Sequence, residues 1–208
     1  MIALFQNLLI PEDRRIQKLL NLSPHILREL LPSSPVNIKD IFVLFDYGNK
    51  IIKLIVKSIK YKNNVNLRKR VAGYLYEETM ELCSDLTLFE GTPPILLPMP
   101  MSKDEKNKKG FNQCEELCKE IEKLSSGNIK ISYDALKKIK ETKRQTTLSR
   151  EERELNVEDS MQAEEKIIKN KTIIVLDDVY TTLATFSEAR RALKYAGARR
   201  IIGIFIAH

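Results

Sequence analysis

Two adjacent carboxylates, Asp177 and Asp178, end an apolar run near the C-terminus. Three threonines follow them closely, at positions 181, 182 and 185. Carboxylates suit the vicinal hydroxyls of a sugar or the waters around a Mg²⁺ ion. Threonine hydroxyls, together with the free N–H groups of a helix N-terminus, suit phosphate oxygens. A hydroxyl clamp beside a phosphate cradle fits a ribose 5-phosphate. The alternative for the same residues is a solvated acidic turn before an ordinary threonine-capped helix.

The residues around this stretch predict the elements that position it. Ile173 to Leu176 is short, apolar and mostly β-branched, which favours a strand buried on both faces. Residues 185–196 have helical periodicity, and Gly197 is suited to the left-handed position that ends a helix. A second apolar run follows, from Ile201 to Ala207. This strand–helix–strand order indicates a parallel sheet, in which ligands bind beyond the carboxyl ends of the strands.

The rest of the chain extends the same fold class. Apolar runs at 41–45 and 95–99 predict two further strands, and the intervening segments have amphipathic helical patterns. Residues 101–110 are polar and rich in lysine, and we interpret them as a loop. We therefore predict an α/β protein with a parallel-centred sheet flanked by helices, in which 172–176 and 201–206 are neighbouring parallel strands.

Composition limits the function more weakly than the motifs do. The 208 residues carry a net charge of +7, which favours polyanionic partners without choosing between nucleic acid and polyphosphate ligands. No apolar run approaches the length of a membrane span, so we expect no membrane insertion and a cytoplasmic location. The three cysteines contain no C-x-x-C pair and are interpreted as buried thiols of a reducing compartment: Cys83, Cys114 and Cys118.

Two segments lie outside the main pattern. Residues 1–35 hold short helical patterns interrupted by prolines and predict an N-terminal helical cap segment, ahead of a domain spanning residues 36–208. Residues 137–157 are highly charged with few apolar anchors, and we expect 140–157 to be less ordered than the sheet. This segment is a solvated loop, a lid over a polyphosphate ligand, or a track for a nucleic-acid backbone.

The stretch from Thr172 to Thr185 resembles the phosphoribosyl pyrophosphate (PRPP) motif of type I phosphoribosyltransferases. That motif consists of four apolar residues, two acids, a short spacer, and Thr-Thr-Gly-x-Thr. One position departs from it, because Leu183 replaces the glycine. Glycine allows a positive φ and close approach to a ligand, so leucine at this position predicts weakened PRPP binding.

The order of motifs along the chain resembles the competence protein F family. These are predicted phosphoribosyltransferases associated with natural transformation. The likeness runs from Asp46 and the Lys60-Tyr61 pair to the end of the chain, through Pro98–Met101, Lys109–Gln113 and the block from Thr142 to Val157. Family members usually carry a four-cysteine zinc module near the N-terminus, and its cysteines are absent here. Lysine replaces two family arginines, at Lys109 and Lys140, and keeps the charge without the bidentate fork.

The resemblance also implies roles for particular residues. It assigns ribose 5-phosphate binding to Asp177, Asp178, Val179, Tyr180, Thr181, Thr182, Leu183, Ala184 and Thr185. It assigns a pyrophosphate loop to Met99, Pro100, Met101, Ser102 and Lys103. Mg²⁺ is the implied cofactor, held through water by Asp177 and Asp178.

No catalytic residue is evident. Threonine stands at position 181, where purine-specific members of the superfamily carry an aspartate, so purine salvage is disfavoured. His25 lies in the cap segment and His208 is the last residue. The acceptor nucleophile is not readable from the sequence.

Two classes of function remain open. The first is an enzyme that uses PRPP, or a protein that binds a ribose 5-phosphate nucleotide. The second is a non-catalytic adaptor of the same fold in DNA uptake or replication restart, with a degenerate PRPP site. Its partners would be DNA-uptake or helicase proteins, or single-stranded DNA. Leu183 and the missing zinc module favour the adaptor, whereas the intact acid pair and the threonines favour the enzyme. The sequence does not exclude self-association.

Overall fold

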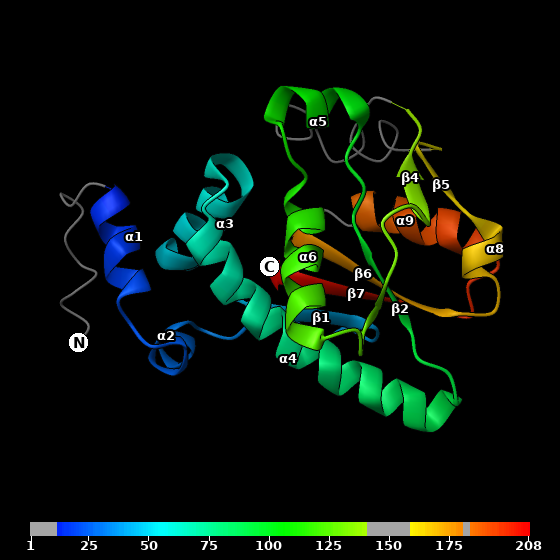
Figure 1. The fold of residues 1–208 in the computed structure, drawn as a ribbon, viewed down its shortest axis with the longest axis horizontal. Coiled ribbons are helices and arrows are strands. Elements are labelled where there is room, and N and C mark those ends of the chain that lie inside the picture. The colour runs from blue at the N-terminus through cyan, green and yellow to red at the C-terminus, as the bar shows by residue number, and fades with distance from the viewer. Residues whose placement is uncertain (1–11, 141–158, 181–183) are drawn as a thin grey trace.

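The structure is a computed structural model, and it describes residues 12–140, 159–180 and 184–208 (Figure 1). Within these residues, five parallel strands form the central sheet in the order β1-β7-β6-β2-β3, and β4 pairs antiparallel with β5. The predicted α/β architecture with a parallel-centred sheet is therefore confirmed. The strands are β1 (Ile41–Phe45), β2 (Ile95–Pro98), β3 (Lys130–Ile131), β4 (Leu136–Lys138), β5 (Met161–Ala163), β6 (Thr172–Val179) and β7 (Arg200–Ala207).

Helices flank this sheet and cover it (Figure 1). Helix α6 packs on β2 and β6 and against α4, while α9 packs on β7 and on the β4-β5 pair. Figure 1 shows α6 in front of the strands and α9 behind β2. The described helices are α1 (Glu12–Leu20), α2 (Pro24–Leu30), α3 (Lys50–Lys62), α4 (Val65–Glu90), α5 (Lys103–Lys109), α6 (Gln113–Ser125), α8 (Glu165–Ile168) and α9 (Ala184–Tyr195).

Strands β6 and β7 form the centre of the sheet. They are parallel neighbours, with Ile173 opposite Ile201, and α9 connects them, as the sequence predicted. The side chains of residues 173–176 are fully buried because helices cover both faces. A Cβ atom at Gly203 would lie 3.0 Å from the ring of Phe186, so this glycine lets α9 pack closely on β7.

One predicted loop is a helix. Residues 103–109 form α5, and the interpretation of 101–110 as a loop was wrong. The segment contains no apolar residue that would mark a buried face, but its ends carry helix signals. Ser102 accepts a hydrogen bond from the Glu105 N–H at the N-terminus, and Gly110 takes a positive φ at the C-terminus. Capping residues, rather than periodicity, were the informative signal here.

The N-terminal helices pack on the longest helix, α4. Leu19 and Leu27 are buried, and the Tyr74 hydroxyl donates to the Pro24 carbonyl at 2.7 Å. The Arg70 guanidinium donates to the carbonyls of Leu20 and Leu22. Among the helices of the described ranges, none is long and apolar enough to cross a membrane.

Candidate functional site

The two acids of the central motif lie at the carboxyl end of β6. Successive side chains of a strand point to opposite faces, so Asp177 and Asp178 face different surroundings. Asp177 is half-buried, whereas Asp178 is only 4% exposed. A buried carboxylate requires partners, and the structure supplies them from two other elements.

Asp178 is held by Lys60 and Gln113. The Lys60 ammonium, at the C-terminal end of α3, lies 2.8 Å from one carboxylate oxygen and 3.1 Å from the other. The Gln113 amide, at the start of α6, donates to Asp178 at 2.8 Å. Three segments that are far apart in the chain therefore meet at one carboxylate.

Electrostatics distinguish the two acids and their lysine. Burial opposes the charge on Lys60, but the attraction and hydrogen bond of Asp178 outweigh it and raise the pKa of Lys60 above its usual range. Desolvation, followed by repulsion from Asp178, raises the pKa of Asp177 well above the usual carboxyl range, and Lys60 only partly offsets this rise. Asp177 is thus the acid that is costly to ionise in the free protein.

Asp177 also has contacts of its own. Its Oδ1 accepts a hydrogen bond from the Asp178 N–H at 2.8 Å and lies 3.5 Å from the Cys114 sulfur. Burial, together with the two acids, raises the pKa of the Cys114 thiol well above its ordinary value, so the thiol is neutral. All three cysteines are free and buried, as predicted from the sequence.

The loop after β2 lies beside the acids because β2 pairs with β6. The Met99 N–H donates to the Leu176 carbonyl at 2.8 Å, and the Asn112 side-chain amide donates to the Met99 carbonyl at 3.0 Å. Met99 and Ser102 are buried, while Lys103 is exposed. The predicted pyrophosphate loop and the predicted ribose clamp are therefore neighbours at the carboxyl end of the sheet.

Lys109 stands next to Gln113 on the approach to α6. Its ammonium donates to the Gln113 carbonyl oxygen and lies 4.5 Å from the centre of the Phe111 ring. Burial, and then repulsion from Lys60, lowers the pKa of Lys109. The ordered contact Lys109–Gln113–Asp178–Lys60 thus links residues of three separate sequence motifs.

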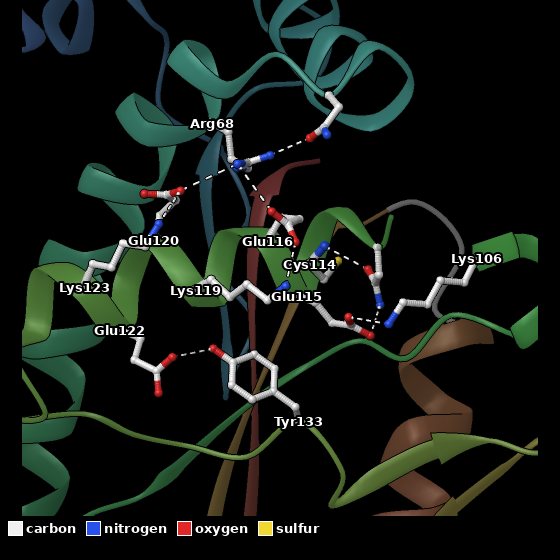
Figure 2. Close-up of polar contacts among 12 residues, drawn as sticks. Arg68, Lys106, Cys114, Glu115, Glu116, Lys119, Glu120, Glu122, Lys123 and Tyr133 are labelled. Carbon is white, nitrogen blue, oxygen red and sulfur yellow. Dashed lines mark hydrogen bonds and ion pairs between the residues drawn. The ribbon is translucent and has the colours of Figure 1, made fainter. Parts of the chain in front are cut away.

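Ion pairs hold α6 in place between α4 and α5 (Figure 2). Arg68 of α4 lies 3.3 Å from Glu116 and 3.6 Å from Glu120. Lys106 of α5 lies 2.7 Å from Glu115 in the first turn of α6. The helix that carries Asn112 and Gln113 is therefore anchored on both sides.

The structure describes some of the predicted site residues, and others lie outside the described residues. Val179 is half-buried, Tyr180 packs its ring on Phe205, and Ala184 and Thr185 open α9. Thr181, Thr182 and Leu183 lie outside the described residues, as does most of the charged 140–157 segment. The lower order expected of that segment therefore stays a prediction.

Neither histidine joins the acids. His25 pairs with Glu29 on α2, and the His208 ring packs against Tyr180. Within 12–140, 159–180 and 184–208, no group of three or more His, Cys, Asp or Glu side chains is placed to hold a metal ion.

Sequence reasoning missed two residues of this site. Lys60 belongs to a cluster that looks like ordinary helix C-terminal cations, and it shares that place with Lys62. Gln113 looks like a first-turn helix residue. No periodicity or spacing identifies either as a partner of Asp178. The available signal was that both belong to the motifs carrying the family resemblance.

Comparisons with known proteins agree with that resemblance. No family model matches the chain. Competence protein F of Haemophilus influenzae is 22% identical over 165 residues, covering 78% of this chain and 70% of the relative. Competence protein ComFC of Streptococcus pneumoniae is 28% identical over 158 residues, covering 76% of this chain and 63% of the relative.

The parallel sheet, with two acids at the carboxyl end of β6, defines an α/β protein with a fold like that of type I phosphoribosyltransferases. The two relatives narrow this class. Both relatives are named as competence proteins, and they support the assignment of this chain to the competence protein F family.

Proposed function

We propose that the chain binds PRPP or a ribose 5-phosphate nucleotide at the carboxyl ends of β2 and β6 and serves DNA uptake in natural transformation. The observation that carries the proposal is the convergence of Lys60 and Gln113 on Asp178, beside the half-buried Asp177. Residues 60, 113 and 178 come from separate motifs of a family whose named relatives are competence proteins. These residues meet at the carboxyl ends of the parallel strands, where ligands bind in such sheets, and this supports a ligand site there.

The roles of the two acids differ in this proposal. Both oxygens of Asp178 lie within hydrogen-bond distance of Lys60, and one also accepts from Gln113, so Asp178 anchors the site. Asp177 is the more exposed acid, and it is the one we assign to the ribose hydroxyls. Among the described residues, no group of three or more His, Cys, Asp or Glu side chains gathers around the two acids. Mg²⁺ fits as part of the PRPP complex, contacting Asp177 through water.

The remaining ligand contacts follow from the motif. The 5-phosphate is assigned to residues 181–185, including Thr185 at the start of α9, and the pyrophosphate to the loop from Met99 to Lys103. The role of residues 181–183 is a sequence prediction, because they lie outside the described residues. In an enzyme with this site, an acceptor nucleophile would form a bond to C1 of the bound PRPP while the bond from C1 to pyrophosphate breaks and pyrophosphate leaves.

Titration calorimetry with PRPP and Mg²⁺ tests the binding proposal. The wild-type protein should bind, and Asp177→Asn should weaken binding by about tenfold through loss of a charged hydrogen-bond acceptor. Asp85→Asn, an exposed site on α4, is the matched control and should bind like wild type. Absence of binding to PRPP and to ribose 5-phosphate at millimolar concentration would contradict the proposal.

The second candidate is a non-catalytic adaptor of DNA uptake with a degenerate PRPP site. It is favoured by Asp178, whose carboxylate is already satisfied within the protein. A transformation assay separates the two functions. In a strain lacking the gene, Asp177→Asn should fail to restore transformation if ligand binding is required. Full complementation by that variant would favour the adaptor and its protein or single-stranded DNA partners.

Leu183 offers a second separation of the two candidates. The motif has glycine at this position, where a left-handed backbone would cost leucine about 1–2 kcal/mol. If that cost applies, replacing Leu183 with glycine should tighten PRPP binding about 5- to 30-fold. The gain should vanish in an Asp177→Asn, Asp178→Asn background, which lacks the ribose clamp. If neither the wild-type protein nor Leu183→Gly binds any phosphorylated ribose, the adaptor would be favoured.

A further inference from the structure

Two adjacent side chains at the start of α6 reach the two loops of the candidate site. The Asn112 amide nitrogen donates to the Met99 carbonyl, at the start of the loop after β2. The Gln113 amide nitrogen donates to Asp178, at the end of β6. Both side chains are buried, with exposures of 2% and 6%. The start of α6 therefore contacts both the loop after β2 and the carboxyl end of β6.

Asn112 makes different contacts with its two polar atoms. Its Oδ1 accepts from the Cys114 N–H at 2.9 Å and caps α6. Its Nδ2 donates to the Met99 carbonyl at 3.0 Å and, at a longer 3.4 Å, to Glu115 in the first turn of α6. The cap needs only an acceptor, which serine or aspartate also provides. The amide donor is therefore an addition to the cap, and its target is the loop.

The helix end is itself fixed from outside the site. Arg68 and Lys106 pair with glutamates of α6, and the Met99 N–H is tied to Leu176 of β6. The distance between the β2 loop and the acids is thus set by side chains that do not have to contact a ligand. We propose that Asn112 and Gln113 are positioning residues that set the spacing between the loop after β2 and Asp178 at the carboxyl end of β6, for a ribose that carries a 5-phosphate and a pyrophosphate. This inference rests on the proposed PRPP site.

The proposal predicts that two ligands will respond differently. PRPP needs both loops, whereas ribose 5-phosphate needs only the β6 side. Loss of the Asn112 donor should therefore weaken PRPP about tenfold and ribose 5-phosphate less than twofold, because the unpaired Met99 carbonyl lets only the β2 loop shift. Gln113→Leu frees Asp178 from its amide partner and should weaken both ligands by similar factors.

The variants are chosen so that the helix survives. Asn112→Asp and Asn112→Ser both keep a cap acceptor and lose the amide donor, and the serine variant adds no charge beside the pyrophosphate. Asn64→Asp is the matched control, because Asn64 caps α4 through an acceptor contact to the Leu67 N–H. Its ligand affinities should equal those of the wild type.

A ligand-free measurement separates failure of this inference from failure of the proposed function. Amide exchange at Met99 and Met101 should accelerate in Asn112→Ser but not in Asn64→Asp. Unchanged exchange, or equal weakening of both ligands in Asn112→Ser, would overturn the positioning role. A PRPP loss confined to Asn112→Asp would also overturn it, because charge would then be the cause. Wild-type protein that binds neither ligand would overturn the proposed function and the spacing for PRPP with it, even if exchange accelerated.

Discussion

The two ends of the parallel sheet carry polar clusters of opposite character. At the amino end, Arg199 pairs with Glu90, and Arg200 lies 2.6 Å from Asp40. The Thr172 hydroxyl donates to Glu90 at 2.6 Å. Each acid at this end has a cation of its own, and these groups hold the start of β6 and β7 against α4.

At the carboxyl end the charges are not matched in the same way. Lys60 pairs directly with Asp178, and the pKa of Asp177 is raised by burial and by the neighbouring Asp178. A cluster that only stabilises the fold has no need for such an arrangement. The comparison shows that the acids at the amino end are paired with arginines, whereas Asp177 at the carboxyl end holds a charge that its surroundings oppose. This difference is what the proposed ligand site would use.

The largest expected effect comes from removing the anchor at the carboxyl end. Asp178→Ala leaves Lys60 and the Gln113 amide without their acceptor. Because Lys60 is one-third exposed, we expect a loss of about 2 kcal/mol in the free energy of unfolding rather than the full cost of a buried pair. Urea unfolding at pH 7 measures it. Asp40→Ala at the amino end is the comparison and should cost less than 1 kcal/mol. Equal losses at the two ends would remove the distinction.

Replacing the neighbouring acid, Asp177, should have a smaller effect on the free energy of unfolding, and of opposite sign. The pKa of Asp177 is raised in the folded protein, so the folded state holds its proton more tightly than the unfolded state does. The contribution of Asp177 to stability should therefore fall as pH rises from about 4 to about 7 and stay level above that. Asp177→Asn removes this dependence and should stabilise the ligand-free protein by about 1 kcal/mol at pH 8, with little gain at pH 4.

Thermal unfolding across that pH range checks the sign. A variant that is less stable than wild type at pH 8 would show that ionised Asp177 stabilises the free protein, against the expectation from its surroundings. The same substitution weakens ligand binding in the proposed function. Stability and function would thus oppose each other at this residue.

The smallest effect is expected at the amino end. Glu90→Gln keeps an acceptor for Thr172 but removes the charge opposite Arg199 and Arg200. Both arginines are more than one-third exposed, so we expect a loss of about 0.5 kcal/mol that shrinks as salt is added. PRPP affinity should stay at the wild-type value. A change in affinity would mean that the two ends are coupled through β6.

Sequence patterns sufficed where burial alone decides structure. The β-branched run before Asp177 predicts a strand because only a strand buries so short a segment on both faces. Helix α5 was missed because its ends are set by capping, and β3 and the β4-β5 pair are too short to leave a periodic signal. The two acids were identified from their position between that apolar run and the threonines that follow.

The partners of those acids were not predictable from local sequence. Lys60 and Gln113 meet Asp178 only after the sheet and helices have assembled, over separations of more than sixty residues. A lysine at a helix end and a glutamine in a first turn have ordinary local explanations. Only three-dimensional placement distinguishes them from their neighbours.

The order of strands in the sheet has a consequence for how the chain folds during synthesis. Strand β7 lies between β1 and β6, with Ile41 opposite Gly203, and the Tyr47 N–H donates to the His208 carbonyl at 2.7 Å. The centre of the sheet therefore cannot close until residues 200–207 have left the ribosome. Until then, β1 and β6 each present an unpaired strand edge. In nascent chains, such edges promote aggregation and are bound by chaperones. Such long-range pairing also makes slow folding the expectation.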